Sequence, residues 1–83
     1  MAKIEIYTTS YCGYCDKAKN LLRSKNIDFT EIELKTQEDR INLVEKANGR
    51  KTVPQIFIND KLIGGYDDLN KLNLEKKLDN LLN

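Results

Sequence analysis

Histidine is absent from this chain of 83 residues, and cysteine occurs only twice, at Cys12 and Cys15. Without histidine, the chain cannot form the cysteine–histidine pair by which thiol proteases activate their nucleophile. It also lacks the ligands to complete a four-coordinate structural zinc site by itself. Attachment of c-type haem is excluded as well, because Asp16 stands where that motif requires a histidine.

The chain has no strong net charge and no long apolar run. Fourteen basic and thirteen acidic residues are interspersed, giving a formal net charge of +1. No run of Lys or Arg could follow a phosphate backbone, which argues against nucleic-acid binding. No window approaches the length of a membrane span, and no apolar signal core precedes the first expected strand. We therefore expect a cytoplasmic protein in a reducing compartment, with no nucleic-acid or membrane partner.

The hydrophobic pattern predicts one α/β domain over residues 1–83, with the order β-α-β-α-β-β-α. Strands are expected at 3–8, 27–34, 55–58 and 61–64, and helices at 13–25, from Thr36 to Asn48, and from Asp67 onward. The first two strands should be parallel and the last two should form a hairpin. In the second helix, Ile41 and Val44 are expected to face the core, with Leu43 as a weaker candidate, whereas Tyr7 and Tyr66 are expected to be packing residues.

The spacing of the two cysteines indicates thiol–disulfide exchange. Cys12 is expected at the start of the first helix, where unpaired N–H groups and the helix dipole favour a thiolate. Cys15 lies almost one turn further along the same face, close enough to attack a disulfide formed on Cys12. We therefore expect Cys12 to be the nucleophile and Cys15 the resolving thiol. An inert structural disulfide is the weaker alternative, because a bridge across so short a loop removes little entropy from the unfolded chain.

Three motifs together resemble those of glutaredoxins. They are Cys12-Gly13-Tyr14-Cys15, Thr52-Val53-Pro54 and Gly64-Gly65-Tyr66-Asp67-Asp68. Over essentially the whole chain, their order and spacing are similar to those of a small bacterial-type dithiol glutaredoxin. The resemblance implies a thioredoxin-like fold, with a four-stranded mixed sheet flanked by helices. It also implies glutathione-dependent reduction of protein–glutathione mixed disulfides and protein disulfides, with ribonucleotide reductase and glutathionylated proteins as expected substrates of a monomer.

The same resemblance implies a glutathione site. Pro54 would be cis and face the sulfurs, leaving Thr52 and Val53 to pair with the cysteinyl part of glutathione through the backbone. Tyr14 would form a wall beside the sulfur.

The other implied contacts lie at the two ends of glutathione. Gly64 and Gly65 would let the backbone approach the ligand, and Asp67 and Asp68 would receive its γ-glutamyl end at a helix N-terminus. The glycine carboxylate would pair with Lys51 or, as weaker candidates, with Gln37 or Arg40.

Two positions near Cys12 depart from the family pattern. Gly13 replaces the proline usual in dithiol members, and Thr9 replaces a frequent lysine. Some family members without that proline hold a [2Fe–2S] cluster between two protomers, using two such cysteines and two glutathiones. A cluster-binding dimer therefore remains an alternative, as does a redoxin reduced by thioredoxin reductase.

Overall fold

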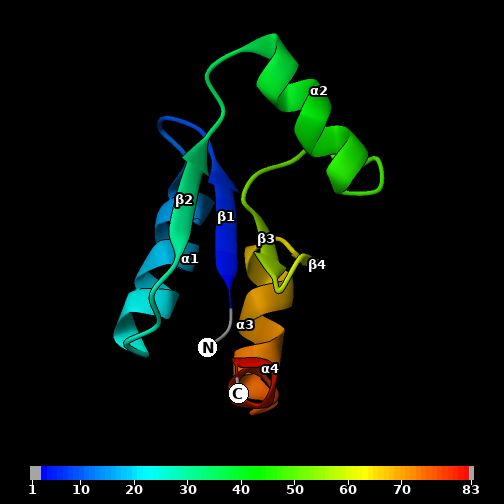
Figure 1. The fold of residues 1–83 in the computed structure, drawn as a ribbon. Helices are drawn as coiled ribbons and strands as arrows, with labels where there is room; N and C mark the ends of the chain where they lie inside the picture. The colour runs from blue at the N-terminus through cyan, green and yellow to red at the C-terminus, as the bar shows by residue number, and fades with distance from the viewer. Residues whose placement is uncertain (1–2, 83) are drawn as a thin grey trace.

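A computed structural model describes residues 3–82, which are organised around a four-stranded sheet (Figure 1). The strands are β1 (Ile4–Thr8), β2 (Thr30–Glu33), β3 (Gln55–Ile58) and β4 (Lys61–Gly64), in the order β2-β1-β3-β4. β1 pairs with β2 in parallel and with β3 antiparallel, and β3 and β4 form an antiparallel hairpin. Positive φ angles of 52° and 66° at Asn59 and Asp60 form the tight turn of this hairpin, as the sequence predicted.

Helices cover both faces of the sheet. They are α1 (Gly13–Ser24), α2 (Gln37–Lys46), α3 (Tyr66–Leu74) and α4 (Leu78–Leu82). Figure 1 shows α2 standing apart from the other three helices. The arrangement confirms the predicted thioredoxin-like fold with its mixed sheet. Within residues 3–82, no helix is both long enough and apolar enough to cross a membrane.

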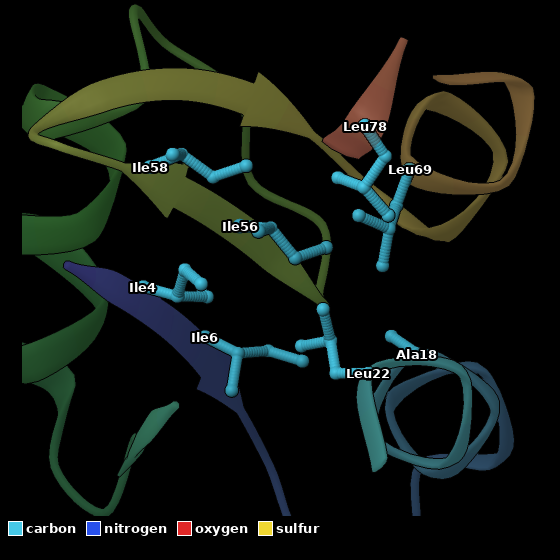
Figure 2. Close-up of a cluster of buried hydrophobic side chains, with 8 residues drawn as sticks. All are labelled: Ile4, Ile6, Ala18, Leu22, Ile56, Ile58, Leu69 and Leu78. Atoms are coloured by element: carbon cyan, nitrogen blue, oxygen red, sulfur yellow. The ribbon is translucent and has the colours of Figure 1, made fainter. Parts of the chain in front are cut away.

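The larger core cluster lies between one face of the sheet and helices α1, α3 and α4 (Figure 2). Its eight buried members are Ile4, Ile6, Ala18, Leu22, Ile56, Ile58, Leu69 and Leu78. The alternation of side chains along β1 and β3 sends the even-numbered isoleucines to this face. Tyr7 and Phe57 point to the opposite face, where they pack with Leu43 and Ala47 of α2.

β2 is shorter than the predicted strand over 27–34. The first residues of that range take part in the turn that ends α1, so they cannot pair with β1. Asn26 adopts a φ of 57°, and the N–H of Ile27 donates to the carbonyl of Leu22 at 3.0 Å. This helix-ending turn holds Ile27 and Phe29 against the core without pairing them to β1.

The prediction that Ile41 faces the core is wrong, since its side chain is 51% exposed. The buried residue of α2 is Leu43, the weaker candidate, and the C-cap residue Ala47 is buried four positions later on the same side. Ile41 lies two residues before Leu43, which turns it to another side of the helix.

Both ends of α2 are closed by local hydrogen bonds. At the start, the N–H of Asp39 donates to the Thr36 hydroxyl, while the Asp39 carboxylate accepts the N–H groups of Thr36 and Lys35. At the end, Asn48 has a φ of 55°, and the N–H of Gly49 donates to Val44 O at 2.8 Å. The predicted stop at Asn48-Gly49 is confirmed.

Candidate active site at the Cys12–Cys15 disulfide

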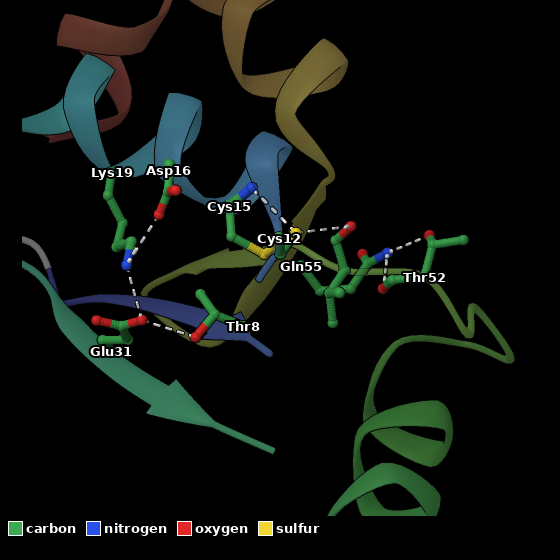
Figure 3. Close-up of a disulfide and its surroundings, with 9 residues drawn as sticks. Thr8, Cys12, Cys15, Asp16, Lys19, Glu31, Thr52 and Gln55 are labelled. Atoms are coloured by element: carbon green, nitrogen blue, oxygen red, sulfur yellow. Dashed lines mark hydrogen bonds and ion pairs between the residues drawn. A yellow bond between two sulfur atoms is a disulfide. The ribbon is translucent and has the colours of Figure 1, made fainter. Parts of the chain in front are cut away.

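Cys12 and Cys15 form a disulfide at the N-terminus of α1, with their Cα atoms 5.2 Å apart (Figure 3). Cys12 is the N-cap residue, and its Sγ accepts the N–H of Cys15 at 3.2 Å. Cys15 is buried, with 1% of its surface exposed, whereas Cys12 is partly exposed. The geometry therefore offers only one of the two sulfurs to an incoming thiol.

The loop before β3 faces this sulfur. The Val53–Pro54 peptide bond is cis, as the resemblance implied, and Val53 O lies 4.0 Å from Cys12 Sγ. Gln55 is fully buried, and its Nε2 donates to Thr52 O at 3.0 Å and to Thr52 Oγ1 at 3.2 Å. Gln55 thereby fixes the conformation of Thr52 beside the site, a role that the sequence analysis missed because nothing in the alternation of β3 marks it.

A cavity of about 250 Å³ opens next to the disulfide. Its lining consists of Tyr14, Arg50, Thr52, Val53, Pro54, Gly65, Tyr66, Asp67 and Asp68. The structure thus brings together, around one cavity, the residues that the resemblance assigned to glutathione except Gly64, Lys51 and the weaker candidates. The ring of Tyr14 is 59% exposed and lies 6.2 Å from that of Tyr66, centroid to centroid.

The far wall of the cavity is the N-terminus of α3. The Asp68 carboxylate accepts the N–H of Gly65 at 3.0 Å and pairs with Arg50 Nη2 at 3.3 Å. Gly64 has a φ of +122°, and a Cβ at this position would meet the Asp68 carboxylate and approach Arg50 Nη1 to 2.7 Å. The positive φ therefore favours glycine here, and a side chain at this position would force the Asp68 carboxylate and the Arg50 guanidinium to shift. Asp67 is exposed and its carboxylate makes no hydrogen bond with any other residue of the described part of the chain.

Lys51 does not line this cavity. It borders a second hollow of about 440 Å³ along α2, together with Gln37 and Arg40. Arg50 occupies the place beside Asp68, and the sequence analysis did not select it. The signal available was its position two residues before Thr52, which did not distinguish Arg50 from Lys51.

A charged cluster joins β1, β2 and α1 beside the disulfide (Figure 3). The buried Thr8 hydroxyl donates to Glu31 Oε2 at 2.7 Å, and Lys19 Nζ donates to the same oxygen at 3.0 Å. The Thr8 hydrogen bond, followed by that of Lys19, lowers the pKa of Glu31. Lys19 also lies 3.6 Å from Asp16, so the cluster anchors the first turns of α1 to the sheet.

Comparisons of the chain with known proteins agree with the resemblance to glutaredoxins. The glutaredoxin family model matches residues 4–63. The chain is 49% identical over 81 residues to Glutaredoxin 1 of Rickettsia prowazekii, covering 95% of this chain and 85% of that protein. It is 46% identical over 82 residues to Glutaredoxin 3 of Escherichia coli K12, covering 99% of each.

A solved structure adds a ligand to the comparison. The crystal structure of a buckwheat glutaredoxin–glutathione complex has a TM-score of 0.87 and 30% identity, covering 98% of this chain and 76% of that one. The chain belongs to the glutaredoxin family, as a dithiol member with the pair Cys12–Cys15 and the activity of a glutathione-dependent thiol–disulfide oxidoreductase.

Proposed function

We propose that Cys12 is the nucleophile of this oxidoreductase and Cys15 the resolving thiol. The observation that carries this assignment is the difference in exposure between the two sulfurs, with Cys15 only 1% exposed and Cys12 accessible at the helix N-terminus. An unpaired N–H at a helix start stabilises a thiolate, and the Cys15 N–H already points at Cys12 Sγ.

On a glutathionylated protein, the Cys12 thiolate attacks the glutathione sulfur, and the protein leaves as a thiolate. The mixed disulfide between Cys12 and glutathione then reacts with the thiolate of a second glutathione. That thiolate attacks the glutathione sulfur, glutathione disulfide leaves, and the Cys12 thiolate is restored. One free glutathione is consumed in each cycle, the glutathionyl group of the substrate leaves within the glutathione disulfide, and Cys15 is not needed.

On a protein disulfide, the Cys12 thiolate attacks one substrate sulfur and forms a mixed disulfide with it, while the other substrate sulfur leaves as a thiolate. The Cys15 thiolate then attacks Cys12 Sγ, and the second substrate thiolate leaves. This step produces the Cys12–Cys15 disulfide, the state that the structure records. Two glutathione molecules reduce it again.

The cavity beside Cys12 supports a glutathione site with the following roles. Thr52, Val53 and Pro54 would present backbone to the cysteinyl part, and Tyr14 would pack beside its sulfur. Gly65, Asp67 and Asp68 would receive the γ-glutamyl end at the N-terminus of α3, where N–H groups bind a carboxylate. Lys51 would reach the glycine carboxylate from the neighbouring hollow, and Arg40 and Gln37, which line the same hollow, are the weaker candidates for this contact. The glutathione bound by the buckwheat relative supports the choice of ligand.

The proposal extends to the setting of the protein. It is a small glutaredoxin of bacterial type with a Cys-Gly-Tyr-Cys site, forming one domain, acting as a cytoplasmic monomer. Its substrates are glutathionylated proteins and protein disulfides such as that of ribonucleotide reductase.

The test is a glutathione-coupled mixed-disulfide reductase assay on the wild type, Cys12→Ser and Cys15→Ser. We expect Cys12→Ser to abolish reduction of both kinds of substrate. Cys15→Ser should retain reduction of glutathionylated substrates and lose reduction of protein disulfides. Complete loss of both activities in Cys15→Ser would contradict the division of roles.

Gly13 favours a second candidate, a [2Fe–2S] cluster shared by two protomers. A Cβ at this position would meet nothing within 4 Å, so the first turn of α1 is open beside Cys12. Two Cys12 thiolates and two glutathiones would provide the four sulfur ligands. Anaerobic reconstitution with iron, sulfide and glutathione tests this candidate, and a colourless monomer would rule it out.

A further inference from the structure

The second hollow, which we name the α2 groove, is larger than the cavity beside Cys12 and has a different chemistry. Its volume is about 440 Å³, and aliphatic side chains from Leu34, Ile41, Leu43 and Val44 form its floor. Ile41 is 51% exposed, although it lies in the middle of a helix with a buried face on the other side. Leu34 and Leu43 are buried and Val44 is partly buried, so Ile41 is the aliphatic side chain that the groove presents to a partner. An exposed aliphatic group within an apolar hollow is typical of an interaction surface.

Glutathione does not account for this floor. Its three residues are γ-glutamate, cysteine and glycine, and none carries an aliphatic side chain that would fill the groove. The glycine carboxylate needs only a cation at the edge. An occupant with a hydrophobic side chain of its own is required to cover Ile41.

The groove adjoins the proposed reaction site through the backbone. Lys51, at the edge of the groove, directly precedes Thr52, which lines the cavity beside Cys12. A polypeptide whose cysteine is joined to Cys12 would therefore have its neighbouring residues within reach of the groove. Glutathione joined to Cys12 would bring only its glycine to the edge of the groove and no aliphatic side chain.

The charges at the edge of the groove favour an acidic partner. Arg40 and Lys51 border it, and neither forms an ion pair with another residue between 3 and 82. Glu45 is the one acidic residue in the lining. Positive charge at the edge of an apolar groove is complementary to a segment that carries both an aliphatic and an acidic residue.

We propose that the α2 groove docks the substrate polypeptide next to its target cysteine, with an aliphatic side chain against Ile41 and an acidic residue beside Arg40 and Lys51. The proposal rests on the proposed function, because docking matters only if Cys12 attacks a polypeptide disulfide. In that step the polypeptide, and not glutathione, is joined to Cys12, so the glycine carboxylate does not occupy Arg40 and Lys51. It makes Ile41 a residue that discriminates between protein substrates without taking part in the chemistry.

The test compares Ile41→Ser with Leu74→Ser, a matched loss of an aliphatic group that is 73% exposed on α3 and lies in neither hollow. The substrates are a peptide with Leu and Glu beside its cysteine that is joined to a second copy by a disulfide, the same disulfide-linked peptide with Ser and Lys in those places, and the glutathione–cysteine mixed disulfide. For the Leu-Glu peptide we expect Ile41→Ser to raise KM about tenfold with kcat unchanged. The other two substrates, and Leu74→Ser with all three, should behave as the wild type.

A second variant at the same position distinguishes a loss of docking from misfolding. Ile41→Asp adds a negative charge and should raise KM for the Leu-Glu peptide more than Ile41→Ser does, while the reaction with the glutathione–cysteine disulfide confirms that the fold is intact. An unchanged KM for the Leu-Glu peptide overturns the proposal. So does an equal rise for the glutathione–cysteine disulfide, which would assign the groove to glutathione. A concentration-dependent dimer in sedimentation that Ile41→Ser abolishes would also overturn it, since the occupant would then be a second copy of the chain. Failure of the wild type to reduce the glutathione–cysteine disulfide would instead refute the proposed function.

Discussion

At the scale of single residues, the loop that leads to Cys12 contains a tyrosine in an unfavourable conformation. Tyr11 has a φ of 57° and its side chain is fully exposed. The left-handed conformation costs about 1–2 kcal/mol for a residue with a Cβ, and the exposed ring gains little from packing. The loop thus holds Tyr11 in place through its neighbours, including the hydrogen bond from the Ser10 hydroxyl to Glu33 Oε1 at 2.7 Å.

This conformation predicts an order of stability among variants at position 11. Tyr11→Gly should be more stable than Tyr11→Ala by about 1 kcal/mol, because only glycine adopts the positive φ without strain. Thermal unfolding of the two variants, both in the oxidised state, measures the difference. Equal midpoints would show that the loop relaxes to a negative φ when the ring is removed.

Gly64 and Gly13 form a contrasting pair of glycines beside the site. Gly64→Ala should lower stability by about 1–3 kcal/mol, because the new Cβ would collide with the Asp68 carboxylate at a positive φ. It should also raise KM for glutathionylated substrates, since Asp68 and Arg50 must move. Gly13→Ala should be tolerated or stabilise α1 by about 0.5 kcal/mol, because its Cβ has open space. Denaturant unfolding and the coupled reductase assay measure both effects, and a well-folded Gly64→Ala with normal KM would contradict the described packing.

At the scale of secondary-structure elements, α2 depends on the hydrogen bonds at its start. The backbone N–H of Lys35, followed by that of Thr36, lowers the pKa of the Asp39 carboxyl. A folded-state pKa below the unfolded one means that Asp39 stabilises the protein above its unfolded pKa. This contribution is lost as the pH falls through the folded pKa.

The prediction is that Asp39→Asn destabilises the protein at pH 7 and that the difference from the wild type shrinks as the pH falls below about 4. Asn keeps the shape of the side chain and removes its charge. Thr36→Ala removes the hydroxyl that accepts the N–H of Asp39. It should lower the free energy of unfolding by about 1 kcal/mol. Urea unfolding at a series of pH values checks both, and a difference for Asp39→Asn that stays constant into acid would contradict the role of its charge.

The elements show how far the sequence could be interpreted. Alternation and helical spacing located the four strands and helices α1 to α3, because in this chain the buried stripe is nearly continuous on α1, β1 and β3. The leucines after Asp67 left open whether the chain ends in one helix or two, and the structure has α3 and α4. They failed where a local hydrogen bond overrides the pattern, as at Ile27, whose N–H closes α1. They also failed at Ile41, because α2 faces the sheet with few buried residues and leaves an ambiguous stripe. Arg50 could not have been found, since its contact with Asp68 depends on how the chain returns from α2 to β3.

At the scale of the whole molecule, the two faces of the sheet are covered unequally. Eight buried residues hold α1, α3 and α4 to one face, whereas four hold α2 to the other. Local opening requires less free energy where fewer apolar contacts are broken. The helix that forms the proposed docking groove should therefore open more easily than α1.

Amide hydrogen exchange should report this inequality. At neutral pH we expect the amides of α2 to exchange faster than those of α1 and β1, which should require opening close to global unfolding. Exchange measured by nuclear magnetic resonance on the oxidised protein gives the values residue by residue. Protection in α2 equal to that in β1 would show that the smaller cluster is as cohesive as the larger one.

The turn at Asn48-Gly49 links this opening to the chemical ageing of the protein. An asparagine followed by glycine loses ammonia when the glycine backbone nitrogen attacks the side-chain carbonyl. In the folded chain that nitrogen is engaged, because the N–H of Gly49 donates to Val44 O at 2.8 Å. Deamidation at Asn48 must therefore wait until the last turn of α2 opens. The rate at which aspartate and isoaspartate appear at this position would therefore report how often the last turn of α2 opens.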